Sequence, residues 1–77
     1  MKTLTLYVGR ECHLCEIARR ELAPLRDELG FAVLEVDITG VPELEERYRR
    51  FLPVGEVDGE RVFVYRVEAD AVRASVG

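Results

Sequence analysis

The chain has 77 residues, of which 48% are hydrophobic and 34% are charged, and it contains only 3 prolines and 6 glycines. These values exclude a disordered or fibrous protein and fit one small globular domain over residues 1–77. The net charge of −4 argues against a nucleic-acid partner, because binding to phosphates draws on clustered positive charge.

The N-terminal segment alternates in character and is rich in Thr, Tyr and Val, so we expect a strand over residues 2–8. It lacks the long apolar core of a signal peptide or a membrane span, and we therefore expect a cytoplasmic protein with no membrane partner. In that reducing compartment a lone cysteine pair is more often catalytic or metal-binding than a permanent cross-link.

A helix is predicted after this strand, because apolar residues recur at helical spacing and Gly30 is typical of a C-terminal cap. The apolar positions are Leu14, Ile17, Ala18, Leu22, Leu25 and Leu29. Leu14 is therefore expected to pack into the core. Pro24 lacks a backbone N–H and clashes with the preceding turn, so we expect a kink or a break around residues 20–24.

The next segment, FAVLEVDI over residues 31–38, is almost continuously apolar, as in a strand buried on both faces of a mostly parallel sheet. A second helix is expected to begin at Pro42 and to end near Phe51. Its inward positions are Val41, Leu44, Tyr48 and Phe51.

Asp58 and Gly59 suit a tight turn between two antiparallel strands within residues 53–65. Apolar residues within residues 67–77 predict a short third helix. The complete order is βαβαββα, which indicates an α/β domain.

The two cysteines of the chain, Cys12 and Cys15, are separated by His13 and Leu14. Cys12 falls at the first turn of the predicted helix, where unpaired amides and the helix dipole stabilise an anion such as a thiolate. Cys15 lies one turn further along, close enough for a disulfide and more shielded by the helix. This asymmetry predicts that Cys12 attacks a disulfide and that Cys15 resolves the product.

Two points stay open at this level. A charged His13 would favour the Cys12 thiolate, but His13 could equally be an exposed residue without a specific contact. A closed zinc site needs four ligands, and the chain offers two cysteines and one histidine, so no metal site within one chain is predicted. A metal or iron–sulfur cluster shared between two chains is the alternative.

The sequences CHLC, LEVDI and LPVGEVDGERVF resemble the thioredoxin fold in its small glutaredoxin form, and the resemblance covers nearly the whole chain. It is greatest to a group of short, mostly bacterial glutaredoxin-like proteins. The resemblance implies a four-stranded mixed sheet with helices on both faces. It also implies that Cys12 is the nucleophile and Cys15 the resolving cysteine.

The same resemblance implies a cis peptide bond between Leu52 and Pro53, which faces the cysteines and docks the substrate chain. Arg10 and His13, which lie beside the cysteines, complete the expected substrate-binding residues. Glutaredoxins that use glutathione carry a CPYC motif with a lysine three residues before it, and a Gly-Gly turn before the last helix. This chain has Gly9 and YRVEAD at those places, so glutathione is expected to be a poor substrate.

These features predict a monomeric thiol–disulfide oxidoreductase that works through a mixed disulfide and needs no cofactor. Its partners are expected to be protein or low-molecular-weight disulfides. The alternative function is a binding module or a metal or iron–sulfur cluster carrier that uses Cys12 without turnover.

Overall fold

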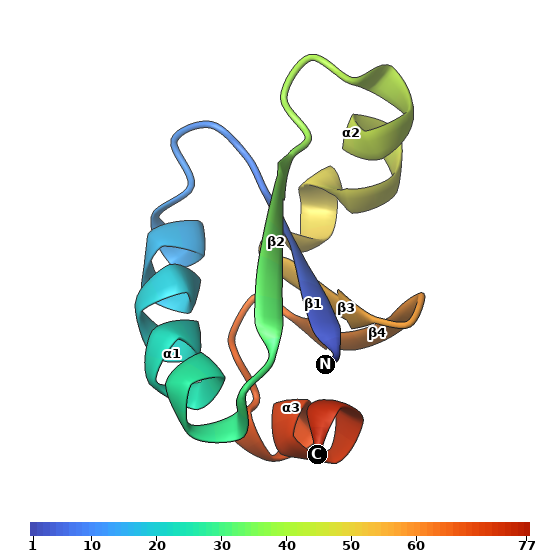
Figure 1. Ribbon diagram of the computed structural model, residues 1–77. Coiled ribbons are helices and arrows are strands. Elements are labelled where there is room, and N and C mark those ends of the chain that lie inside the picture. The colour runs from blue at the N-terminus through green and yellow to red at the C-terminus, as the bar shows by residue number, and fades with distance from the viewer.

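The computed structural model describes residues 1–77 and contains four strands and three α-helices (Figure 1). The elements are β1 (Thr3–Val8), α1 (His13–Leu29), β2 (Ala32–Asp37), α2 (Pro42–Tyr48), the 3₁₀-helix η1 (Arg49–Phe51), β3 (Val54–Val57), β4 (Glu60–Val64) and α3 (Ala69–Val76). The predicted βαβαββα order is therefore confirmed.

The four strands form one mixed sheet in the order β2-β1-β3-β4. β1 pairs with β2 in parallel and with β3 in antiparallel register, and β4 is antiparallel to β3. Asp58 and Gly59 join β3 to β4 with positive φ angles of 53° and 78°, as a tight hairpin turn requires.

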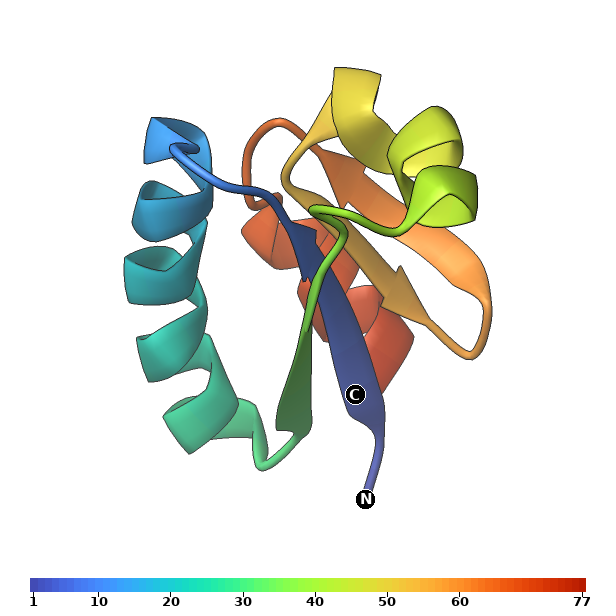
Figure 2. The same ribbon diagram turned by 90° about the horizontal axis from the view of Figure 1, so that it is seen from above.

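Successive side chains of β1 point to opposite faces of the sheet, and each face is covered by helices. Leu4, Leu6 and Val8 belong to a core cluster that also contains buried residues of α1 and α3. Tyr7 points the other way and stacks on Tyr48 of α2, with the ring centroids 3.9 Å apart. Figure 2 shows α1 and α2 on opposite sides of β1, which confirms the predicted arrangement of the helices.

The predicted break around residues 20–24 does not occur, because α1 continues from His13 to Leu29. Pro24 lies on the exposed side of this helix. Arg20, whose carbonyl loses its usual helical partner, is also exposed, so water can hydrogen-bond to that carbonyl. The helix thus tolerates the proline on its solvent side.

The expectation that residues 31–38 are buried on both faces is wrong for most of the strand. β2 is an edge strand, and Leu34 is 55% exposed. The antiparallel strand β3 occupies the far side of β1, so β1 takes the central place and β2 has only one neighbour. None of the helices has the length and apolar character needed to cross a membrane.

Candidate active site

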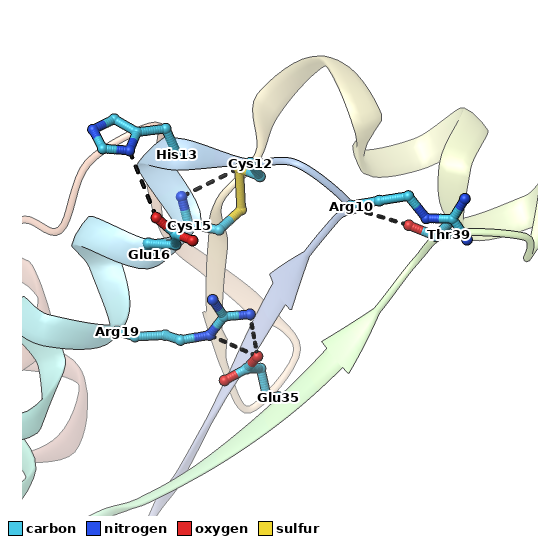
Figure 3. The surroundings of a disulfide bond; sticks show 8 residues. All are labelled: Arg10, Cys12, His13, Cys15, Glu16, Arg19, Glu35 and Thr39. Carbon is cyan, nitrogen blue, oxygen red and sulfur yellow. Dashed lines mark hydrogen bonds and ion pairs between the residues drawn. A yellow bond between two sulfur atoms is a disulfide. The ribbon is translucent and has the colours of Figure 1, made fainter.

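Cys12 lies at the N-cap of α1, at the end of the loop that leaves β1. Its Sγ accepts a hydrogen bond of 3.2 Å from the backbone N–H of Cys15 (Figure 3). The preceding residue, Glu11, has a positive φ of 54°, and this turn brings the chain into the helix. The first N–H groups of a helix have no partner within the helix, so the sulfur takes the place of the usual Ser or Asp cap.

Cys12 and Cys15 form a disulfide, with their Cα atoms 5.2 Å apart. Cys15 is 1% exposed and belongs to the core cluster, whereas Cys12 is only partly buried. Of the two sulfurs, that of Cys12 is therefore the one that an incoming molecule can reach.

His13 and Leu14, the two residues between the cysteines, are both exposed. His13 Nδ1 lies 3.6 Å from a carboxylate oxygen of Glu16, and its ring points away from the disulfide (Figure 3). The expectation that Leu14 packs into the core is wrong, because its exposed fraction is 43%. Cys15 and Ala18 take the inward positions at this end of α1 instead.

Arg10 fixes the loop through its backbone rather than through its side chain. Its N–H donates a 3.0 Å hydrogen bond to Oγ1 of Thr39, and the N–H of Thr39 donates a 2.8 Å bond to Oδ1 of Asp37. These bonds connect the segment before Cys12 to the end of β2. The Thr39 hydrogen bonds, with a smaller contribution from the Arg10 charge, hold the pKa of Asp37 below its usual value.

The Arg10 side chain points away from the disulfide in Figure 3. One turn beyond Cys15, Arg19 forms an ion pair of 2.6 Å with Glu35 of β2. The hydrogen bond to Glu35 is the main reason why the pKa of Arg19 is raised. The start of α1 is thus tied to β2 on both sides of the cysteines (Figure 3).

Leu52 and Pro53 connect η1 to β3, and the peptide bond between them is cis. Pro53 is buried and Leu52 is partly buried. In the antiparallel register of β1 and β3, Tyr7 pairs with Val54. Continued in the same sense, this register places Pro53 beside Val8 and Leu52 beside Gly9, along the segment that leads to Cys12.

Sequence reasoning missed Tyr65, which lies beside this segment. Its backbone N–H donates to the carbonyls of Phe51, at 3.2 Å, and Pro53, at 2.9 Å. Tyr65 is 46% exposed and has a positive φ of 68°. In the sequence Tyr65 looks like the last residue of a strand, and no pattern there signals such a backbone conformation.

No group of three or more His, Cys, Asp or Glu side chains lies close enough together to hold a metal ion within one chain. What the site offers is one reachable sulfur at a helix N-terminus and a second, buried sulfur bonded to it. This arrangement suits the exchange of disulfide bonds.

Solved structures with low sequence identity share this fold. A protein from Nitrosomonas europaea, solved by NMR in solution, is 24% identical and superposes with a TM-score of 0.88 over 99% of this chain and 92% of its own. The germline-specific thioredoxin Deadhead from Drosophila melanogaster is 22% identical, with a TM-score of 0.57 over 95% of this chain and 73% of its own. These likenesses show a thioredoxin-like fold.

Relatives with higher sequence identity are uncharacterized proteins of Mycobacterium tuberculosis and Mycobacterium bovis. Each is 31% identical over 70 residues, which cover 84% of this chain and 72% of the relative. The family model described as Glutaredoxin-like domain (DUF836) matches residues 3–77. With almost its whole length matched, this chain belongs to the glutaredoxin-like domain family.

Proposed function

We propose that this protein is a thiol–disulfide oxidoreductase that works through Cys12 and Cys15. The observation that supports this function best is the environment of Cys12 Sγ, which is partly exposed and accepts a hydrogen bond from the N–H of Cys15. That donor stabilises negative charge on the sulfur, so it favours Cys12 both as an attacking thiolate and as a leaving group.

The reaction begins with the reduced chain. The Cys12 thiolate attacks one sulfur of a substrate disulfide, a bond forms between them, and the other substrate sulfur leaves as a thiolate. Cys15 then gives up its proton and attacks the Cys12 sulfur, and the second substrate thiolate leaves. The substrate disulfide gains two electrons, its two thiolates take up the proton from Cys15 and one from water, and the chain ends with the Cys12–Cys15 disulfide. In reverse, the same steps oxidise a dithiol.

The position of Leu52 and Pro53 supports a role in docking the substrate chain, because they lie along the segment that leads to Cys12. Arg10 and His13 point away from the disulfide, and we assign them contacts with outer parts of the substrate. We propose peptide and protein disulfides as the main substrates and small disulfides such as that of glutathione as poor ones. The protein acts as a cytoplasmic monomer and needs no cofactor.

The test is a single turnover of the reduced protein with a disulfide-bonded peptide. The parent chain should release both peptide thiols and become oxidised. Cys15→Ser should release only one and should accumulate a covalent adduct with the other, visible by intact mass. Cys12→Ser should release none, and release from this variant at the parent rate would contradict the proposal.

Metal analysis of protein purified without oxygen distinguishes the alternative function. The proposed enzyme should be colourless and free of stoichiometric iron. A coloured protein that contains iron and sulfide, with no release of thiols from the peptide, would instead support a cluster carrier.

A further inference from the structure

Tyr65 occupies a rare type of turn immediately after β4. The N–H of Arg66 donates a 2.7 Å hydrogen bond to the carbonyl of Val64, and the residue between them has a φ of 68°. A bond between residues two apart, around a positive φ, defines the classic γ-turn, which is strained for a residue with a side chain. Glycine would adopt it without this cost.

Only two other residues that are not glycine have a positive φ, and they lie in different parts of the structure. Asp58 belongs to the hairpin turn, where such an angle is ordinary. Glu11 immediately precedes Cys12. Costly backbone conformations therefore occur on two segments of the candidate site, and strain that persists in this way points to a function for the residues that carry it.

The backbone of Tyr65 is fastened to the proposed docking segment. Its N–H lies between the carbonyls of Phe51 and Pro53, one on each side of Leu52. Val64, just before it, pairs with Val54 at the start of β3. These bonds hold the start of the segment after β4 beside the end of η1 and the start of β3.

The side chain of Tyr65 remains available for contact. Nearly half of the residue is exposed, and its phenol group makes no hydrogen bond within the protein. Its ring is tilted against that of Phe51, with the centroids 6.3 Å apart, so it packs beside another aromatic ring. Leu14, between the two cysteines, is another of the few exposed large apolar residues.

We propose that Tyr65 determines substrate specificity by offering its ring to an apolar side chain of the substrate. The inference rests on the proposed function and narrows its substrate class. A peptide chain docked along Leu52 and Pro53 would place the residue next to its cysteine against the Tyr65 ring. Burial of a bulky apolar side chain there favours peptide disulfides over small polar ones.

The test compares two disulfide-bonded peptides that differ only in the residue beside the cysteine, which is leucine in one and serine in the other. The second-order rate constant for single turnover is measured for the parent, Tyr65→Phe and Tyr65→Gly. The parent and Tyr65→Phe should prefer the leucine peptide by about tenfold, the size expected of such an apolar contact. Tyr65→Gly should react with both peptides at nearly equal rates.

Denaturant unfolding of the same variants separates this role from a structural one. Glycine adopts a positive φ without strain, so Tyr65→Gly should unfold at the same urea concentration as the parent or at a higher one. A tyrosine needed only for folding would give the opposite result, a loss of stability without a change in preference. Leu34→Ser, at another exposed apolar residue on β2, serves as the control and should keep the parent preference.

Each remaining outcome is decisive. An unchanged preference in Tyr65→Gly, or an equal loss in Leu34→Ser, overturns the inference and leaves the proposed function standing. A parent chain that shows no preference for the leucine peptide also overturns the inference and leaves the proposed function standing. A parent chain that reduces neither peptide overturns the proposed function, and this inference with it.

Discussion

A methyl group added to Gly9 would lie 2.7 Å from Cδ1 of Leu52, too close for two carbon atoms. The loop that leads to Cys12 and the residue before Pro53 thus approach each other so closely that a side chain at position 9 fits only if the Leu52 side chain shifts. In the glutathione-using glutaredoxins that the sequence resembles, a lysine is expected at this distance before the first cysteine. A lysine here would push the Leu52 side chain out of the position that it occupies in this chain.

Gly9→Ala should push the Leu52 side chain aside and slow the reaction with a peptide disulfide. The clashing atom is the end of a flexible side chain, so the loss of stability should be about 1 kcal/mol, at the low end for overpacking. The rate constant for single turnover should fall more than this small change in stability explains. Both quantities are measured on the same preparation, by thiol release and by urea unfolding.

Leu52→Ala provides the control for the Gly9 variant, because it removes the atom that clashes. In the double variant the effects should be less than additive, since residues in contact couple energetically. Gly40→Ala, at a glycine with open space around it but a φ of 83°, should lose stability without this coupling. Strict additivity of Gly9→Ala and Leu52→Ala would contradict the contact.

The two cysteines should differ in reactivity once the disulfide is reduced. Cys15 is 1% exposed, whereas Cys12 is partly exposed and caps a helix. With a limiting amount of an alkylating reagent at neutral pH, Cys12 should be labelled at least about tenfold faster, since reactivity follows accessibility and thiolate character. Peptide mapping by mass spectrometry measures both rates, and urea-unfolded protein, in which they should converge, is the control. Faster labelling of Cys15 would reverse the assigned roles.

The fold was largely predictable because its signals are local and repeated. Alternation in β1, helical spacing after Cys12 and the Asp58–Gly59 turn each define an element without tertiary contacts. The order of these elements then leaves few topologies. The expected break at Pro24 does not occur, because the cost of a proline depends on whether its side of the helix faces solvent, and that follows from packing against the sheet.

The site was predictable only in part, for a related reason. Cys12 and Cys15 are visible as a motif, and Leu52 with Pro53 through the resemblance to a family. The exposure of Leu14 and the γ-turn at Tyr65 depend on how α1 and β4 end against neighbouring segments. The apolar run of β2 was interpreted as buried, although sheet order places the strand at an edge. Spacing along a sequence does not encode which strand lies outermost.

Gly55 and Phe63 form a cross-strand pair that should dominate the stability of the hairpin. They are partners between β3 and β4, and a Cβ on Gly55 would collide with three carbons of the Phe63 ring. Phe63 is buried, so its ring has little room to move. Gly55→Ala should therefore destabilise the protein by about 2–3 kcal/mol, near the upper range for overpacking, as urea unfolding would show.

A smaller residue opposite should compensate for this change. Phe63→Leu alone should also destabilise the protein by leaving a cavity. The double variant Gly55→Ala and Phe63→Leu should nevertheless lose less unfolding free energy than the two single variants lose together. If Gly55→Ala unfolds at the parent urea concentration, the ring is not fixed as described.

Acid should loosen the loop before Cys12, because Asp37 anchors it through Thr39. Hydrogen bonds from Thr39 lower the pKa of the Asp37 carboxyl in the folded chain below its ordinary value of 3.8. A group whose pKa is lowered by folding stabilises the fold above its ordinary pKa, and this contribution is lost as the pH falls through the folded value.

Asp37→Asn keeps an acceptor for the Thr39 N–H but cannot titrate. The parent should therefore be more stable than Asp37→Asn at pH 7, and the difference should shrink as the pH falls below 3.8. Glu45, whose pKa is lowered chiefly by its hydrogen bond to Arg49, continues to titrate in both proteins and cancels from the comparison. The N–H of Arg10 donates to the same threonine, and Thr39→Val removes that acceptor. The alkylation rate of Cys12, divided by the fraction of Cys12 present as thiolate, should therefore change in this variant. A difference in unfolding free energy that stays constant from pH 7 to pH 3 would show that the Asp37 charge does not hold this loop.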